Sequence, residues 1–266
     1  MALINFRLKH PDLIVPWGDA PDTSMDWFGL TEGEYWLDLK KATLYEYTDE
    51  ILRGDHDTRY VEFQIARLIE DWTGIFASIA EAVPDGFYSI ANSCSYLYRF
   101  YGAVQQLQDR LTADAAEDVQ AKYDRYDKAI DWIYNRTLLA PHLTCAPGLS
   151  FFRNGDKLAL VWKADHRVES NIPVWTAKNG EIELPYEVFV REMEEFGERF
   201  FSAMDEQVQL AVEKDWGNTK INSARLVKEQ QERRAAFQKK VAVLKEEVMN
   251  PTDWKLVNAV ITEMFS

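Results

Sequence analysis

Histidine titrates nearest neutral pH of all side chains, and the sequence holds four. His10 precedes a proline and is typical of a solvated turn residue. His142 lies between a predicted helix and a predicted strand, where we expect a structural role. Asp55-His56-Asp57 places two carboxylates beside an imidazole, but three consecutive side chains seldom converge on one ion. We therefore predict no metal site there.

The segment Asp165-His166-Arg167 has the residue types that acid–base chemistry requires. It lies between two predicted hairpins, and Trp162 and Trp175 nearby are candidates to line a pocket. One hypothesis is therefore a small-molecule enzyme with its site near Asp165 and His166. The alternative is a charged connection between strands, which is the interpretation we favour.

Other catalytic and cofactor-binding patterns do not occur in the sequence. It lacks the Gly-x-Ser-x-Gly elbow, the GxGxxG fingerprint and the phosphate-binding GxxxxGK[ST] loop. Cys94 falls on the apolar stripe of a predicted helix, and Cys145 has no CxxC partner, which is typical of reduced thiols. We expect no cofactor and no catalytic residue.

The elements that would position such residues begin with a predicted antiparallel meander. Its strands are residues 3–8, a hairpin of 27–30 with 35–39, and 43–47. A 3.6-residue apolar period then predicts a helix over about 58–82, and two more helices before Pro141. Short breaks between these three helices favour packing as a bundle.

Two Asn-Gly pairs organise the next stretch. Asn154-Gly155 and Asn179-Gly180, each flanked by apolar strands, predict hairpins of 149–153 with 157–163 and of 172–177 with 181–184. Pro185 then opens a long helix that Trp216-Gly217-Asn218 interrupts. A helix over about 222–248 and a short one over 252–264 complete the chain.

The pattern predicts an α+β fold in which antiparallel β-hairpins accompany about five to six long, mostly antiparallel helices, with helix predominant. We expect residues 1–146 to form one unit and 147–266 another, with one continuous domain as the alternative. No apolar run approaches the length that crosses a bilayer, and the first ten residues do not resemble a signal peptide, so we expect a cytoplasmic protein.

Charge is unevenly distributed along the sequence. The net charge is −14, of which residues 1–85 contribute −10, with 17 acidic and 7 basic residues. Such an excess repels a phosphate backbone and an anionic membrane, so we expect neither nucleic acid nor membrane as a partner. A basic protein would be attracted.

Two segments carry a resemblance to known sequences: Pro16-Trp17-Gly18-Asp19 leading to Trp27-Phe28-Gly29-Leu30-Thr31-Glu32-Gly33-Glu34-Tyr35-Trp36-Leu37, and Pro173-Val174-Trp175-Thr176-Ala177 with Gly180-Glu181 and Leu184-Pro185. Over most of its length the chain resembles a bacterial protein family known as a domain of unknown function. The resemblance implies aromatic and turn residues that mark a fold, and it implies no activity.

We therefore expect a non-catalytic binding protein, most concretely a bacterial immunity protein that neutralises a cognate toxin through an acidic surface. Loop carboxylates are free of predicted packing contacts and could meet a basic toxin domain, and two tryptophans close to them in sequence could anchor the interface. The candidate partner-binding residues are Trp17, Asp19, Asp22, Asp26, Trp27, Asp49, Glu50, Asp55 and Asp57.

Overall fold

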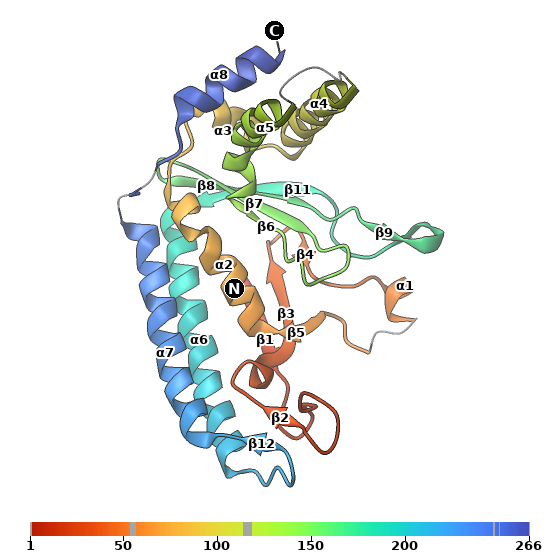
Figure 1. Cartoon of the computed structure of the whole chain (residues 1–266), viewed down its shortest axis with the longest axis vertical. Coiled ribbons are helices and arrows are strands. Elements are labelled where there is room, and N and C mark those ends of the chain that lie inside the picture. Colours follow the sequence, from red (N-terminus) through yellow and green to blue (C-terminus); the bar gives the residue numbers. More distant parts are fainter. Residues whose placement is uncertain (1, 54–56, 114–118, 247, 250, 266) are drawn as a thin grey trace.

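The computed structural model describes residues 2–53, 57–113, 119–246, 248–249 and 251–265. Figure 1 shows three levels: helices above, a sheet across the middle, and a second sheet with two long helices below. The α-helices are α1 (Asp49–Leu52), α2 (Ile65–Ala80), α3 (Asp85–Ala91), α4 (Cys94–Ala113), α5 (Val119–Tyr134), α6 (Tyr186–Glu213), α7 (Ser223–Ala242) and α8 (Trp254–Phe265). This mixed α+β architecture confirms the predicted fold class.

The strands form two four-stranded antiparallel sheets and two short pairs. They are β1 (Ile4–Leu8), β2 (Ser24–Met25), β3 (Glu32–Asp38), β4 (Thr43–Leu44), β5 (Val61–Gln64), β6 (Thr137–Leu138), β7 (Gly148–Asn154), β8 (Lys157–Lys163), β9 (Arg167–Val168), β10 (Ile172–Pro173), β11 (Gly180–Pro185) and β12 (Lys220–Ile221).

The middle sheet, in the order β11-β8-β7-β6, has a different core on each face. Phe151 and Leu160 are register partners and belong to the larger core below the sheet. Phe152 and Ala159, one residue along each strand, belong to a second core under α3, α5 and α8. Because successive side chains of a strand point to opposite faces, the β7–β8 hairpin contributes buried side chains to both cores.

The long helices α6 and α7 lie side by side along the lower core (Figure 1). Phe196, Phe200 and Phe201 of α6 are buried there. A side chain at Gly197 would place its Cβ 2.2 Å from the ring of Phe237, so glycine is what lets α7 approach α6.

The structure corrects the predicted meander and the first predicted helix. Residues 27–30 form no strand, because Asp26 accepts a hydrogen bond from the backbone N–H of Gly29 and the chain turns into a short 3-10 helix. β1 pairs with β3 instead. Residues 61–64 form β5 on the other edge of β3, and the helix begins only at Ile65.

Two further expectations are wrong, and both involve non-local pairing. The hairpin at Asn154-Gly155 forms as predicted, with Gly155 at φ +60°. The one at Asn179-Gly180 does not, because β11 pairs with β8 and β10 pairs with β9. The first three long helices form no bundle: α2 lies in the larger core, while α4 and α5 lie over the opposite face of the middle sheet.

The division at residue 146 stays a prediction. Elements from both sides of it share the middle sheet, since β6 pairs with β7. They also share the upper core, where α8 packs against α5.

Candidate functional site

The first group of predicted contact residues, Trp17, Asp19, Asp22 and Asp26, lies in a loop over residues 11–26 that the connection between α6 and α7 holds. Lys214 donates from Nζ to the carbonyl of Pro11 at 2.8 Å and pairs with Asp12 at 3.0 Å. The hydroxyls of Thr23 and Thr219 lie 3.0 Å apart, and β2 runs parallel to β12. The loop therefore has a defined shape, although it contains little regular structure.

This loop presents apolar side chains beside carboxylates. Leu13, Val15 and Trp17 are 65, 76 and 43% exposed. Asp19 and Asp22 follow them and are also exposed. We call these five residues the loop surface. Large exposed apolar groups next to polar ones are typical of protein interfaces, because exposing apolar surface to water costs free energy that is recovered when a partner covers it.

Backbone pairing and one glycine position Trp17. Its N–H and C=O exchange hydrogen bonds with those of Ser24, at 2.8 and 2.9 Å. A Cβ at Gly29 would lie 2.7 Å from Nε1 of Trp17, so the ring rests directly on that glycine. The indole is thus supported on one side and open to solvent on the other, the arrangement of a pre-organised anchor.

Trp27 corrects the sequence prediction. It is 1% exposed, and its Nε1 donates to Oε1 of Gln230 at 2.8 Å. The Arg233 guanidinium lies over its ring, 4.7 Å from the centroid. A side chain enclosed in this way cannot reach a partner protein, so Trp27 belongs to the core and not to the interface.

Two of the loop carboxylates already have partners within the chain. Asp26 is exposed but caps the turn at Gly29. Asp22 pairs with Lys220 at 2.7 Å, with both side chains mostly exposed, so this ion pair contributes little to stability. Asp19 has no ion pair within the described part of the chain. The carboxylate most accessible to a basic partner is therefore Asp19.

The second predicted group lies apart from the loop surface. Asp49 and Glu50 form the first turn of α1, which Thr48 caps through its side chain. Glu50 lies 3.8 Å from Arg53, and Asp57 is exposed. Asp55, like His56, lies outside the described residues. Figure 1 shows α1 and β2 at separate places, so the two groups form no single face.

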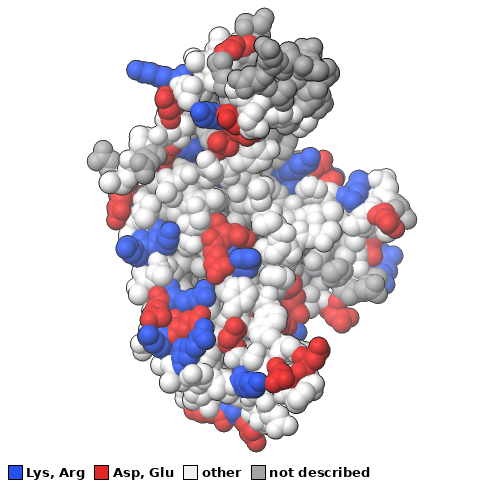
Figure 2. All heavy atoms as spheres, in the orientation of Figure 1, with Lys and Arg blue, Asp and Glu red and all other residues white. Residues whose placement is uncertain are grey.

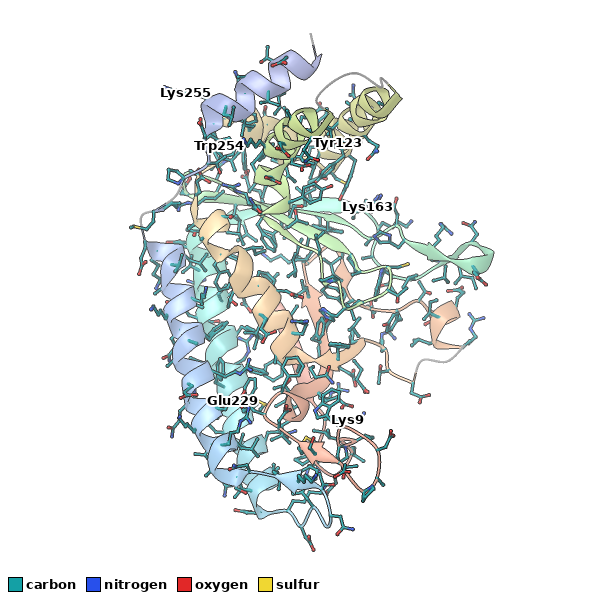
Figure 3. The ribbon with its side chains drawn as sticks, in the orientation of Figure 1. Lys9, Tyr123, Lys163, Glu229, Trp254 and Lys255 are labelled. Atoms are coloured by element: carbon teal, nitrogen blue, oxygen red, sulfur yellow. The ribbon has the colours of Figure 1, made fainter. Side chains whose placement is uncertain are left out.

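The acidic excess of residues 1–85 is largely engaged inside the chain. Lys9, labelled in Figure 3, donates to Glu32 at 2.7 Å and to Glu62 at 3.0 Å, and these hydrogen bonds raise its pKa. Arg59 donates to Glu46 at 2.6 Å. Figure 2 accordingly shows both signs of charge interspersed on one face. Exposed carboxylates remain at the loop surface, but the N-terminal third as a whole is not one acidic face.

The Asp165-His166 segment lies at the base of the β9–β10 arm, the projection at the right of Figure 1. His166 is half-buried; its burial, and the charge of Lys163, lower the pKa of its imidazole. Trp162 and Trp175 are buried, and each donates its indole N–H to a backbone carbonyl at 2.7 Å. They hold loops in place, so neither offers an open aromatic wall beside His166.

Sequence reasoning gave His142 only a general structural role and missed its partners. Its Nε2 lies 3.1 Å from the hydroxyl of Tyr35, and its Nδ1 lies 3.3 Å from Asp71. The hydroxyl of Tyr45 is buried nearby with no hydrogen bond in the described structure. Burial raises the pKa of both tyrosines. Tyr35 is fully buried, so these groups anchor the 140–147 connection to the lower sheet without access to a substrate.

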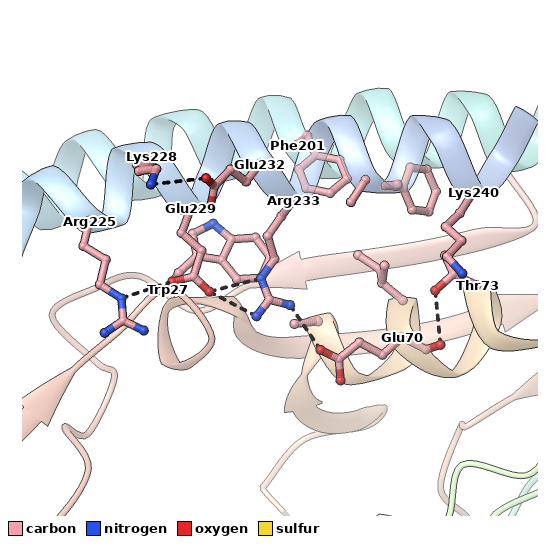
Figure 4. A pocket seen from close by; sticks show the side chains of 14 residues that line it. Trp27, Glu70, Thr73, Phe201, Arg225, Lys228, Glu229, Glu232, Arg233 and Lys240 are labelled. Atoms are coloured by element: carbon pink, nitrogen blue, oxygen red, sulfur yellow. Dashed lines mark hydrogen bonds and ion pairs between the residues drawn. The ribbon is translucent and has the colours of Figure 1, made fainter.

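A groove of about 710 Å³ lies between α2 and α7 (Figure 4). Its floor is apolar and includes Ile69, Phe201 and Phe237. Arg233 crosses it, bonding Glu229 on its own helix at 3.0 Å and Glu70 on α2 at 3.1 Å. The rim charges therefore neutralise one another and link the two helices.

Neither a metal cluster nor a spanning helix is found in the part of the chain that the structure describes. No group of three or more His, Cys, Asp or Glu side chains there could hold a metal ion. No helix there is both long enough and apolar enough to cross a membrane.

Comparison with known families gives one result: the model of a family of unknown function, DUF5984, matches residues 3–260. The chain belongs to this family. That match confirms the resemblance seen in the sequence. No curated protein and no solved structure matches the chain. Membership of DUF5984 brings no activity with it, so function has to be argued from the surfaces above.

Proposed function

We propose that this protein is a non-catalytic binding protein that engages a basic protein through the loop surface. The observation that carries the proposal is the exposure of Leu13, Val15 and Trp17 beside Asp19 and Asp22. Burying three large apolar side chains against a partner would contribute several kcal/mol, at about 25 cal/mol per Å². Carboxylates at the rim would favour partners with lysine and arginine there.

The partner class we propose is a bacterial toxin, which the protein neutralises in the cytoplasm as an immunity protein. Inhibition by covering an active site needs a rigid contact surface and no chemistry of its own. The loop surface fits this requirement, because Lys214 and the backbone N–H of Lys220 donate to backbone carbonyls of the loop that carries it, and the hydroxyl of Thr219 lies against that of Thr23. Asp49, Glu50 and Asp57 would be a second, separate contact region.

The test is affinity capture from the native bacterial host with the full chain and two matched variants. Trp17→Ala removes the central aromatic of the loop surface. Tyr96→Ala is the control: Tyr96 is 54% exposed on α4, at the opposite end of the molecule (Figure 1). We expect one basic protein in stoichiometric amount with the wild type and Tyr96→Ala, and at least tenfold less with Trp17→Ala.

The captured protein is then expressed alone in a naive host. We expect it to stop growth, and co-expression of the wild type, but not of Trp17→Ala, to restore growth. Absence of a stoichiometric basic partner, or equal capture by Trp17→Ala, would refute the proposed function.

The enzyme hypothesis has one observation in its favour. Burial and the charge of Lys163 lower the pKa of His166, which favours the neutral imidazole, the form that accepts a proton. If growth rescue in the assay above depends on His166 and Asp165 and not on Trp17, the enzyme becomes the better interpretation.

A further inference from the structure

A second groove, of about 700 Å³, lies where the β3–β4 turn meets the turn that precedes β11. Figure 1 shows β4 reaching the edge of the middle sheet at this point. Lys40 and Lys41 line the groove from the first turn, and Lys178 and Asn179 line it from the second. We call it the lysine groove.

The three lysines differ from most cations of this acidic chain. Lys9, Arg59, Lys214, Lys220 and Arg233 all have carboxylate partners. Lys40, Lys41 and Lys178 are exposed and have no ion pair within the described residues. A chain with a net charge of −14 offers many carboxylates, yet none of them pairs with these three ammonium groups in the described structure, and all three lysines line one groove.

Two carboxylates also line the groove, and each accepts a hydrogen bond from the backbone. Asp38 accepts a hydrogen bond from the backbone N–H of Lys40 at 3.0 Å. Glu181 accepts one from the backbone N–H of Cys94 at 3.0 Å. Each therefore stabilises backbone geometry, and neither forms an ion pair with the lysines within the described structure.

The backbone that carries these lysines is unusual. Lys40 has φ +63°, in the left-handed region where glycine or asparagine is favoured and other residues cost about 1 kcal/mol. Backbone strain of this kind is concentrated at binding and catalytic sites.

The opposite turn is fixed by two side chains. Trp162 donates to the carbonyl of Lys178 at 2.7 Å. Oδ1 of Asn179 accepts from the backbone N–H groups of Ala164 and Asp165, at 2.8 and 3.1 Å. That use of the oxygen leaves the amide NH₂ of Asn179 as a donor, and it has no partner in the described structure.

We propose that the lysine groove binds a small polyphosphate, a ligand with two or more phosphate groups. Three ammonium groups and an amide donor on two fixed turns match a compact polyanion, and lysine binds phosphate as a point charge. The volume is in the range of small-ligand sites. This site is independent of the loop surface and of the proposed function.

The test is calorimetric titration of the full chain with inorganic tripolyphosphate at low salt. Lys41→Ala/Lys178→Ala removes two of the three charges. Lys239→Ala/Lys255→Ala is the matched control, because it makes the same change in net charge at exposed lysines of α7 and α8. We expect one site, an affinity loss of about tenfold or more in the first variant and less than about twofold in the control.

Lys41→Arg/Lys178→Arg should retain most of the affinity, since the charges remain. Equal thermal unfolding of all variants shows that the fold is intact. Absence of binding, or an equal loss in the control, would overturn the site. Citrate binding as tightly as tripolyphosphate would overturn its assignment to phosphate.

Discussion

A buried carboxylate and a pair of exposed ones have opposite relations to the fold of this molecule. Glu81 is buried at the end of α2 and accepts hydrogen bonds from the backbone and hydroxyl of Thr252, at 2.7 and 2.6 Å, and from the indole of Trp254 at 2.9 Å. It also pairs with Arg136. The loop carboxylates Asp19 and Asp22 face solvent. The first place joins segments distant in sequence, whereas at the second Asp22 pairs only with the exposed Lys220 and Asp19 has no ion pair in the described part of the chain.

The difference between the two places is the free-energy cost of leaving a charge without a partner. Arg136 is 1% exposed, donates to the carbonyl of Trp132 at 2.7 Å and lies over the ring of Trp254, labelled in Figure 3. Burial lowers its pKa, and Glu81 opposes that shift. A buried charge needs partners inside the fold, and Nε of Arg136 still has none in the described structure, whereas an exposed charge can exchange water for a partner at low cost.

The largest effect should come from Glu81→Gln. The amide keeps the shape but turns an NH₂ toward groups that all donate, and it leaves the Arg136 guanidinium buried without a counter-charge. We expect a loss of about 3–5 kcal/mol in the free energy of unfolding, measured by urea denaturation. Asp19→Asn is the control and should change it by less than about 0.5 kcal/mol. Equal effects at the two positions would contradict the comparison.

The next largest effect should distinguish Trp27 from Trp17, which the sequence analysis placed together as interface residues, by the loss of unfolding free energy on substitution. Trp27→Phe removes the indole N–H and leaves Oε1 of Gln230 buried without that donor, so we expect a loss of about 1–3 kcal/mol. Trp17→Phe should cost less than about 0.5 kcal/mol, because the side chain is exposed. Thermal and urea unfolding measure both; a larger loss for Trp17→Phe would refute the assignment of Trp27 to the core.

A smaller effect is expected at Gly29, where the fold supports the loop surface. In Gly29→Ala the new methyl would meet Nε1 of Trp17 at 2.7 Å and Sδ of Met25 at 3.0 Å. The indole would shift, at a cost of about 1–2 kcal/mol. We expect altered tryptophan fluorescence and weaker partner capture. Gly86→Ala is the control, since nothing lies within 4 Å of its Cβ position.

The smallest effect concerns pH and the anchor at Asp12. The hydrogen bond from Lys214, and then its charge, lower the pKa of Asp12 below 3.8. Its contribution to stability is therefore complete above that value and is lost as the pH falls through the lower pKa of the folded state. The difference in unfolding free energy between wild type and Asp12→Asn should shrink from about pH 6 to about pH 2.5. A difference that stays constant would refute the anchor.

Local signals in the sequence predicted local structure well. The Asn154-Gly155 turn forms its hairpin because residues close in sequence pair there and Gly155 takes a positive φ without a steric penalty. The interruption at Trp216–Asn218 separates α6 from α7 for the same kind of reason. Family membership was also visible in the turn and aromatic residues.

Those local signals could not predict which segments far apart in the sequence pair with each other. Residues 180–185 have the pattern of a hairpin strand, yet β8 is the neighbour that hydrogen-bonds to them. Likewise, Trp17 and Trp27 lie ten residues apart among similar carboxylates, but Trp27 is enclosed by Phe200, Gln230 and Arg233, which come more than 170 residues later. The lysine groove could not be predicted from the sequence for the same reason, because it is lined by two turns more than 130 residues apart.

By itself, the sequence determined the fold class, the family, the turns and the acidic excess, because periodicity, turn chemistry and composition act over a few residues or over the whole chain. The tertiary structure alone decided which carboxylates are buried, which tryptophan is free and which lysines lack a partner. Those properties depend on contacts between distant segments, and the free energy of such contacts is set by packing that no local pattern records.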